Sequence, residues 1–378
     1  MKGSFMKKDS VFHINGDVNG VKVANLKQHI NLSYAAYQTI EEDSKIFSNG
    51  DDPTLGGFLN RIFLNFYEEA DASITERYWE RYEELEQLFS SREFDSMDKT
   101  ITDTYVVKIA GEREKELIKK SRSYEKGHKF KININKGPLD IIRSSGDASY
   151  YNGIIGQYLK AIYEEYAAKP LFEREAIAFK DVVEKINSAK EQKKRIKLSL
   201  IKRIDPKSNE YKANWFYFLP YGIMQGKASL FSYAVGYFQR IEKDGTLGEW
   251  KVASVRISRI DFCKVQSKSY HLSKAECKQI EDDIAGKGVE YLAGDTKKIK
   301  VRFTDFGLEQ FSQHLFQRPN DYKVSSEDKS IYVFNCTPFQ AKNYFFKFGA
   351  DAEIIEPDDL RKEIAAKYRD AYMRYEGK

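Results

Sequence analysis

The chain has 378 residues, of which 41% are hydrophobic and 14% aromatic. That length and apolar content predict two to four globular domains and exclude a low-complexity or disordered chain. The formal net charge is +5 at pH 7, which is compatible with nucleic-acid binding and does not establish it.

The chain opens with MKGSFMKKD and a second methionine, Met6. This opening looks like an expression remnant, so we expect residues 1–20 to be a tag or flexible N-terminus. The first folded domain is then predicted over 21–170.

An internal repeat dominates this first domain. HINLS at 29–33 and GFLNRIFLNFYEE at 57–69 return as KININ at 131–135 and GIIGQYLKAIYEE at 153–165. Each copy reads as one strand followed by two helices, over 21–70 and 128–170. Because each copy of an internal repeat usually folds as one structural unit, we expect a single chain to form the same module twice.

Both strands alternate between apolar and polar side chains, as a strand with one buried face does. A lone short strand is unstable in water, so each copy needs the other as its partner. We therefore predict a two-stranded antiparallel ribbon packed on four helices. The side chains expected on its outer face are Lys27, His29, Asn31, Lys129, Lys131 and Asn133.

This unit resembles the ribbon-helix-helix family, whose ribbon reads nucleic acid through outward side chains. The resemblance implies that those six residues contact nucleic acid, since lysine reaches phosphates and asparagine reaches base edges. The alternative is a structural helical domain with a solvated strand face. The copies differ, with Lys27 and His29 set against Lys129 and Lys131, which favours single-strand binding over a symmetric duplex reader.

After the first copy we expect a further helix through Ile74, Tyr82 and Phe89. Residues 91–128 are polar and charge-rich, and we interpret them as a connector with some helix. A charged helix is expected around 173–190, after Pro170.

From residue 193 the apolar period changes from helix to strand. Four to five short strands separated by turns predict a small, strongly bent barrel. LPYGI at 219–223, SYAVGY at 232–237 and VRISRIDFCKV at 255–265 resemble the WYL domain, an SH3/Sm-like barrel. Ser232 and Ala234 stand where that family usually has tryptophan and leucine, and Tyr233 is retained.

The barrel domain is expected over 171–285, including a leading helix. A basic, aromatic groove could form on it, because guanidinium groups clamp phosphates and tyrosine stacks bases. The alternative is that Arg256 and Arg259 only satisfy carboxylates or carbonyls at the barrel rim. The candidate groove residues are Lys197, Tyr233, Arg240, Arg256 and Arg259.

Residues 286–378 read as strand–helix, strand–helix, strand–helix and resemble the C-terminal extension that follows the WYL barrel. Leu360, Ile364, Tyr368, Ala371 and Tyr375 form an apolar stripe on the last helix. The predicted fold class is therefore α+β: two ribbon-helix-helix-like half-units, a small barrel and an α+β extension.

Several expectations concern what the sequence lacks. No nucleotide, hydrolase or metalloprotease motif is present, and carboxylate pairs such as Glu164 and Glu165 are expected on exposed helix ends. Cys263, Cys277 and Cys336 have no metal spacing and are expected to be reduced thiols. No long apolar run or secretory leader is visible. We expect a cytoplasmic protein that is no enzyme and holds no metal or cofactor.

The order of the parts resembles that of WYL-domain accessory proteins of type VI-D CRISPR systems. This resemblance implies a homodimer that binds single-stranded RNA and stimulates an RNA-guided RNase. The runner-up is a ligand-responsive, DNA-binding transcriptional regulator. A third interpretation is an interaction scaffold whose basic faces meet an acidic partner.

Overall fold

The computed structural model describes residues 22–47, 54–90, 127–145, 151, 153–203, 211–226 and 230–377, together with Phe12, Ile14, Asp17 and residues 108–109. The chain divides into two compact units, Met1–Lys180 and Asp181–Lys378. The division thus falls at residue 180 rather than at the predicted 170. Mixed helix and sheet content makes the protein α+β, as predicted.

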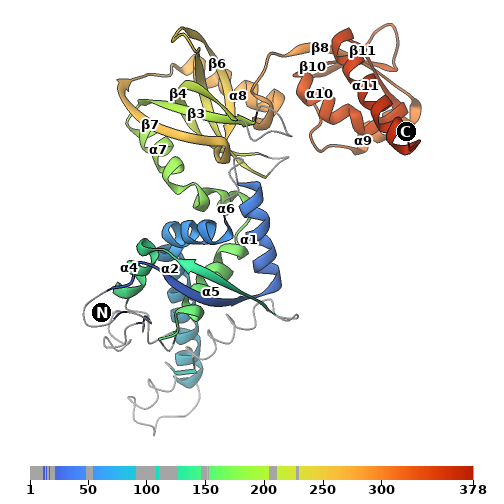
Figure 1. Ribbon diagram of the computed structural model, residues 1–378. Helices are drawn as coiled ribbons and strands as arrows, with labels where there is room; N and C mark the ends of the chain where they lie inside the picture. The colour runs from blue at the N-terminus through green and yellow to red at the C-terminus, as the bar shows by residue number, and fades with distance from the viewer. Residues whose placement is uncertain are drawn as a thin grey trace. The chain divides into compact units, whose positions relative to one another are not determined.

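The first unit carries the predicted ribbon (Figure 1). Strand β1 (Leu26–Leu32) pairs antiparallel with β2 (His128–Ile134), and Leu26 lies opposite Ile134. On the inner face Ile30, Leu32, Ile132 and Ile134 are all buried. The alternation of apolar and polar residues therefore correctly predicted both strands and the face that each strand buries.

Helices follow each strand in the same order. In the first copy these are α1 (Tyr34–Ile46) and α2 (Leu55–Ser90), and in the second α4 (Lys136–Ser144) and α5 (Ile155–Ala168). The stretch expected to be a separate helix through 74–89 is the continuation of α2. The repeat-equivalent pairs Phe63 and Leu159, and Phe66 and Ile162, are buried, so both copies supply the same core positions.

Two residues at matching repeat positions hold the ribbon on its helices. Asn60 of α2 donates from Nδ2 to the Asn133 carbonyl at 2.9 Å and accepts the Asn135 N–H at 2.9 Å. Gly156 of α5 lies so close to β1 that an added Cβ would stand 2.9 Å from the His29 carbonyl oxygen. The strands are thus fixed by a side-chain clamp in one copy and by a close backbone approach in the other.

The expectation that Glu164 and Glu165 are solvated is wrong. Glu164 is buried and accepts hydrogen bonds from the Ser33 N–H at 2.6 Å and the Ser33 hydroxyl at 2.8 Å. Glu165 forms an ion pair with Arg77 at 2.6 Å. A carboxylate on α5 thus fixes the start of α1, a long-range role that local sequence does not reveal.

Part of the 1–20 segment is packed rather than flexible. Phe12 and Ile14 are buried, and the Phe12 ring stacks on Tyr158 with centroids 5.2 Å apart. Asp17 accepts hydrogen bonds from Arg143, which hold the pKa of that carboxyl below its usual value. The remainder of residues 1–20, and nearly all of the predicted 91–128 connector, lie outside the described residues.

The charged segment after Pro170 forms two helices, α6 (Leu171–Ala178) and α7 (Lys180–Glu191), instead of one. Phe179 separates them with non-helical backbone and is itself buried. Helix α7 opens the second unit.

Five strands of the second unit form one antiparallel sheet in the order β6-β5-β4-β3-β7. Gly236 of β5 lies against a bulge in β4, and an added Cβ there would stand 2.1 Å from the Leu219 carbonyl oxygen. The strands are β3 (Lys194–Arg203), β4 (Tyr211–Gln225), β5 (Ser232–Ile241), β6 (Leu247–Arg256) and β7 (Ile260–Ser269).

This sheet is strongly curled. Strands β6 and β7 are its two edges, yet only the 3-10 turn Ile257–Arg259 joins them. Three residues span roughly 10 Å, so the edges must approach each other at that end. No pairing between β6 and β7 is found in the part of the chain that the structure describes, so the predicted barrel is not closed.

Helix α8 (Lys274–Lys287) covers part of one face of this sheet, which we call the outer face. Ile280 of α8 packs there with Val235 and Tyr237. The opposite face holds the fully buried Ile196, Leu198 and Phe218. The outer face is therefore only partly covered.

The C-terminal residues form a four-stranded sheet in the order β11-β8-β10-β9, carrying helices α9, α10 and α11. Leu360 and Ile364 are buried in its core, whereas Tyr375, the last member of the predicted stripe, is 94% exposed. The elements are β8 (Lys297–Phe303), α9 (Asp305–Gln313), β9 (Tyr322–Val324), β10 (Ile331–Cys336), α10 (Pro338–Phe345), β11 (Ala352–Glu356) and α11 (Asp358–Tyr375).

Candidate nucleic-acid interface

All six predicted ribbon residues are exposed on one face of the ribbon. They form three cross-strand pairs: Lys27 with Asn133, His29 with Lys131, and Asn31 with Lys129. Directly opposed side chains on one face of a sheet lie about 5 Å apart at Cβ. The ribbon therefore presents a compact block of three lysines, two amides and one imidazole.

This block has an approximate two-fold symmetry that the sequence comparison alone did not reveal. Each end carries one lysine opposite one asparagine, and the centre carries His29 opposite Lys131. The two copies thus match at two of three outward positions. The difference between the copies is confined to one central pair.

The ring of Tyr37, on α1, stacks on His128 with centroids 3.8 Å apart and lies 5.4 Å from Phe130. These contacts brace one end of β2 against α1. Together with the Asn60 clamp at the other end, they fix both ends of the strand that carries Lys129, Lys131 and Asn133. A rigid support is what a binding face needs, because less side-chain entropy is lost on binding.

The five predicted groove residues of the sheet do not form one cluster. Tyr233 and Arg256 are direct cross-strand partners, and the Arg256 guanidinium lies 3.2 Å from the Phe231 ring centroid. Arg240 lies at the other end of β5 and pairs with Glu242 at 3.2 Å. Tyr233 and Arg240 are seven steps apart along the strand, a distance of roughly 23 Å.

Lys197 lies apart from that pair, whereas Arg259 follows Arg256 by three residues. Lys197 lies in mid-β3 with its ammonium 5.0 Å from the Trp215 ring centroid. Arg259 is exposed at the end of the 3-10 turn between β6 and β7. Lys197 and Arg240 therefore do not share a groove with Tyr233 and Arg256. The sequence pattern predicted the strands, but not the sheet face or strand end at which each residue lies.

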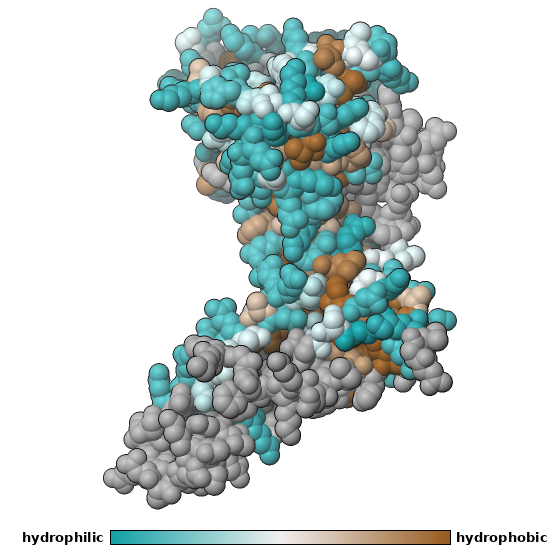
Figure 2. Space-filling model, turned by 90° about the vertical axis from the view of Figure 1, so that its left-hand side faces the viewer, coloured by the Kyte–Doolittle hydropathy of each residue, from teal (hydrophilic) through white to brown (hydrophobic). Residues whose placement is uncertain are grey.

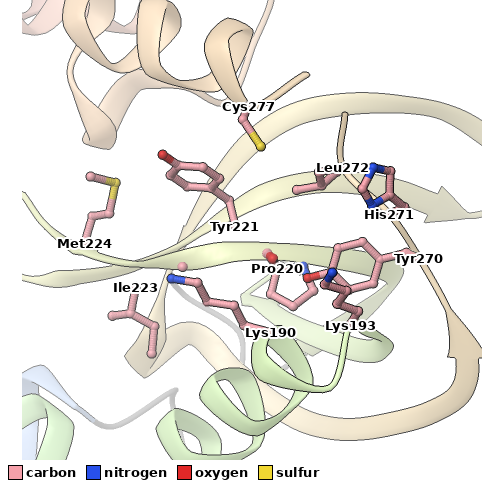
Figure 3. A pocket seen from close by; sticks show the side chains of 11 residues that line it. Lys190, Lys193, Pro220, Tyr221, Ile223, Met224, Tyr270, His271, Leu272 and Cys277 are labelled. Carbon is pink, nitrogen blue, oxygen red and sulfur yellow. Dashed lines mark hydrogen bonds between the residues drawn. The ribbon is translucent and has the colours of Figure 1, made fainter. Parts of the chain in front are cut away.

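A pocket of about 440 Å³ opens where α7, β4 and the β7–α8 link meet (Figure 3). Tyr270 holds its walls together, since its N–H donates to the Lys193 carbonyl at 3.0 Å and its hydroxyl donates to the Pro220 carbonyl. The Tyr221 hydroxyl donates to Glu281 at 2.8 Å, which raises the pKa of Tyr221. The other lining residues include Lys190, Ile223, Met224, His271, Leu272 and Cys277.

This pocket combines apolar walls with basic side chains at its rim. Lys190, Lys193 and His271 are exposed there. Burial raises the pKa of Tyr270 to about 12, so its hydroxyl stays protonated and keeps its bond to Pro220 at neutral pH. The volume suits a small anionic ligand. Sequence analysis missed this site because its residues come from four separate segments.

The three cysteines are free thiols, as expected. Among the described residues, no cluster of three or more histidine, cysteine, aspartate or glutamate side chains could hold a metal ion. The described helices include none long and apolar enough to cross a membrane.

Comparison with known proteins agrees with these observations. Residues 295–372 match the family model described as the WCX domain. This match falls within residues 286–378, the segment expected to form the C-terminal extension.

The whole chain has the fold of a solved structure described as a CRISPR Cas-related protein. The TM-score is 0.67 at 23% identity, over 97% of this chain and 98% of that one. A proteasome accessory factor B/C (PafBC) of Arthrobacter aurescens also matches, at 11% identity over 48% of this chain and 26% of that one. Its TM-score is 0.19. No curated protein matches the sequence.

Proposed function

We propose that this protein is a CRISPR-associated, non-enzymatic regulator that binds single-stranded RNA and stimulates an RNA-guided RNase. The paired outward face of the ribbon is the observation that carries the binding proposal. Three lysines and two asparagines on one supported face match the chemistry of phosphates and base edges. The shared fold with a CRISPR Cas-related protein supports the association with such a system.

We also propose a specific fold for the first unit and for the five-stranded sheet of the second. The first unit would be a ribbon-helix-helix module made by one chain, and the curled five-stranded sheet an SH3/Sm-like WYL barrel. The antiparallel ribbon on repeated helix pairs supports the first assignment. The short β6–β7 link between opposite sheet edges supports the second. A homodimer and a cytoplasmic location belong to the same proposal.

A ligand-responsive DNA-binding regulator is the second candidate. The near two-fold symmetry of the ribbon favours it, because a two-fold reader matches the symmetry of duplex DNA. The basic pocket beside Tyr221 and Tyr270 would then receive the small ligand.

Replacement of the three ribbon lysines tests the binding proposal. The variant Lys27→Ala, Lys129→Ala, Lys131→Ala should bind RNA more weakly, with a salt-dependence slope reduced by about 2, since each single-strand phosphate contact contributes about 0.7. A matched variant removes three exposed lysines of the C-terminal residues, Lys298 in β8, Lys323 in β9 and Lys329 in the β9–β10 turn. Equal affinity and slope in wild type and both variants would refute the ribbon as the contact.

Single replacements separate the two candidates. If the ribbon sits symmetrically on a duplex, Lys27→Ala and Lys129→Ala should weaken binding equally, because both lysines oppose an asparagine. Unequal losses on single-stranded RNA, with little duplex binding by the wild type, support the RNA proposal. Stimulation of RNA cleavage by a purified CRISPR RNase then tests the effector role.

A further inference from the structure

The uncovered half of the five-stranded sheet presents aromatic and basic side chains in two adjacent cross-strand rows. In the first row, Ser199 and Trp215 are flanked by Phe262 at one edge and by Ile241 and Leu247 at the other. The second row runs Lys264, Lys197, Tyr217, Gln239, Trp250. Rows two residues apart along a strand lie roughly 7 Å apart.

Three large apolar side chains of these rows are exposed, and Trp215 and Tyr217 are partly exposed. Phe262 is 39% exposed, Trp250 36% and Leu247 53%, although large apolar groups usually prefer burial. Trp215 contacts Phe262 edge-on with centroids 5.5 Å apart, which holds both rings in place. Helix α8 covers the neighbouring part of this face at Tyr237 and Leu219 and leaves these rows open.

Cations lie directly on these rings. The Arg195 guanidinium lies 3.7 Å from the Tyr217 centroid, and the Lys197 ammonium 5.0 Å from the Trp215 centroid. Lys264 is the cross-strand partner of Lys197 and is exposed. Two neighbouring lysines repel each other, and within the described part of the chain no ion pair of either is found.

One polar atom at this surface is buried and unsatisfied. Arg195 Nε has no hydrogen-bond partner among the described residues. A buried donor without a partner costs free energy, and movement of this guanidinium toward a phosphate oxygen would satisfy it. Asp261 is the acidic group beside the rows, and it accepts a hydrogen bond from Ser199 at 3.4 Å.

We propose that this surface, defined by Arg195, Lys197, Trp215, Tyr217, Trp250, Phe262 and Lys264, is a second nucleic-acid site that binds single strands, whose bases stack on the exposed rings of Trp250 and Phe262. Unpaired bases expose their faces to aromatic rings, whereas a duplex hides them. Three cations beside the rings match the phosphates of such a strand. The inference rests on the proposed nucleic-acid function and adds a contact outside the ribbon.

Tryptophan fluorescence tests this site directly. The chain has three tryptophans, Trp79, Trp215 and Trp250, and the last two belong to the proposed surface. In a Trp79→Phe variant, a short oligoadenylate RNA should quench the remaining emission, and the quenching should saturate as the RNA concentration rises. A duplex of the same length should leave the emission unchanged.

A charge variant provides the second measurement. Lys197→Ala with Lys264→Ala should weaken binding of oligoadenylate about tenfold at low salt and reduce the salt slope by about 0.7 per lost phosphate contact. The matched control, Lys323→Ala with Lys329→Ala, changes two exposed lysines of β9 and the β9–β10 turn and should bind as wild type does. Far-ultraviolet circular dichroism checks that each variant is folded.

The outcomes separate this inference from the function it rests on. RNA binding with unchanged tryptophan emission and unchanged affinity of the double-lysine variant would refute the sheet site and leave the ribbon proposal standing. Failure of the wild type to bind any nucleic acid would refute both. Loss of binding to a protein partner, with RNA binding intact, would make the surface a protein-docking site and also refute the inference.

Discussion

Asp43 lies at the centre of a buried ionic network in the first unit. It is 1% exposed, pairs with Arg174 through Nε at 2.6 Å, and accepts the Tyr166 hydroxyl at 2.9 Å. Burial and the Asp43 carboxylate raise the pKa of Tyr166. The network joins α1, α5 and α6, so three helices depend on one carboxylate.

Asp43→Ala should therefore destabilise the first unit by about 3–5 kcal/mol, because it leaves Arg174 partly buried without its partner. Trp79 is the one tryptophan of residues 1–180, so its emission in a Trp215→Phe, Trp250→Phe background follows unfolding of this unit in urea. Glu68→Ala, an exposed carboxylate of the same unit, serves as the control. An unchanged midpoint for Asp43→Ala would contradict the role assigned to the network.

The cysteines allow a second test at this scale. Burial raises the pKa of Cys263 to about 11 and that of Cys336 to about 12, while Cys277 is partly exposed. Because the thiolate is the reactive form, one of the three thiols should react with Ellman's reagent in the native protein, and all three in denaturant.

The same shifts predict alkaline sensitivity of the second unit. A folded-state pKa above the unfolded value of 9.0 gives stability that is present below pH 9 and is lost as the pH rises through about 11 and 12. Replacement of both buried cysteines by alanine should flatten this loss in chemical unfolding curves. For the labelling test, reaction of all three thiols with Ellman's reagent in the native protein at pH 8 would contradict the burial of Cys263 and Cys336.

At the scale of elements, the ribbon depends on close contact between β1 and α5. Gly156 provides that contact, since a Cβ there would stand 2.9 Å from the His29 carbonyl oxygen. Gly156→Ala should cost about 1–3 kcal/mol of stability through overpacking and displace the strand that carries Lys27, His29 and Asn31.

Thermal unfolding and RNA affinity of Gly156→Ala measure both effects. Gly56→Ala is the matched control, since no atom lies within 4 Å of a Cβ built at that glycine. If Gly156→Ala bound RNA and unfolded as wild type does, the ribbon would not rely on this contact.

The sequence predicted the ribbon well because its signal is local and repeated. Period-two alternation gave the outer face, and the repeat gave the partner strand, so all six candidate residues of the ribbon are found on one surface. The arrangement of residues on the sheet of the second unit was less predictable. Its strands were visible, but register and curl set which residues are neighbours, and Tyr233 and Arg240 are separated as a result.

At the scale of the molecule, each compact unit carries its own basic surface. The first presents the paired ribbon face, and the second presents the open rows of the five-stranded sheet. On the side of the protein that Figure 2 shows, hydrophilic side chains predominate and hydrophobic ones gather in small areas. Two separate nucleic-acid contacts on one chain would raise the affinity for a long strand above that of either alone.

Binding of labelled single-stranded RNA and of duplex DNA of the same length, at two salt concentrations, tests the central claim most directly. The account predicts tighter binding of RNA, with an affinity that falls with salt by about 0.7 per phosphate contact and falls further when Lys27, Lys129 and Lys131 are replaced. Preference for the duplex would contradict the RNA proposal and favour a DNA-binding regulator. Absence of binding to both would contradict a nucleic-acid function of the ribbon altogether.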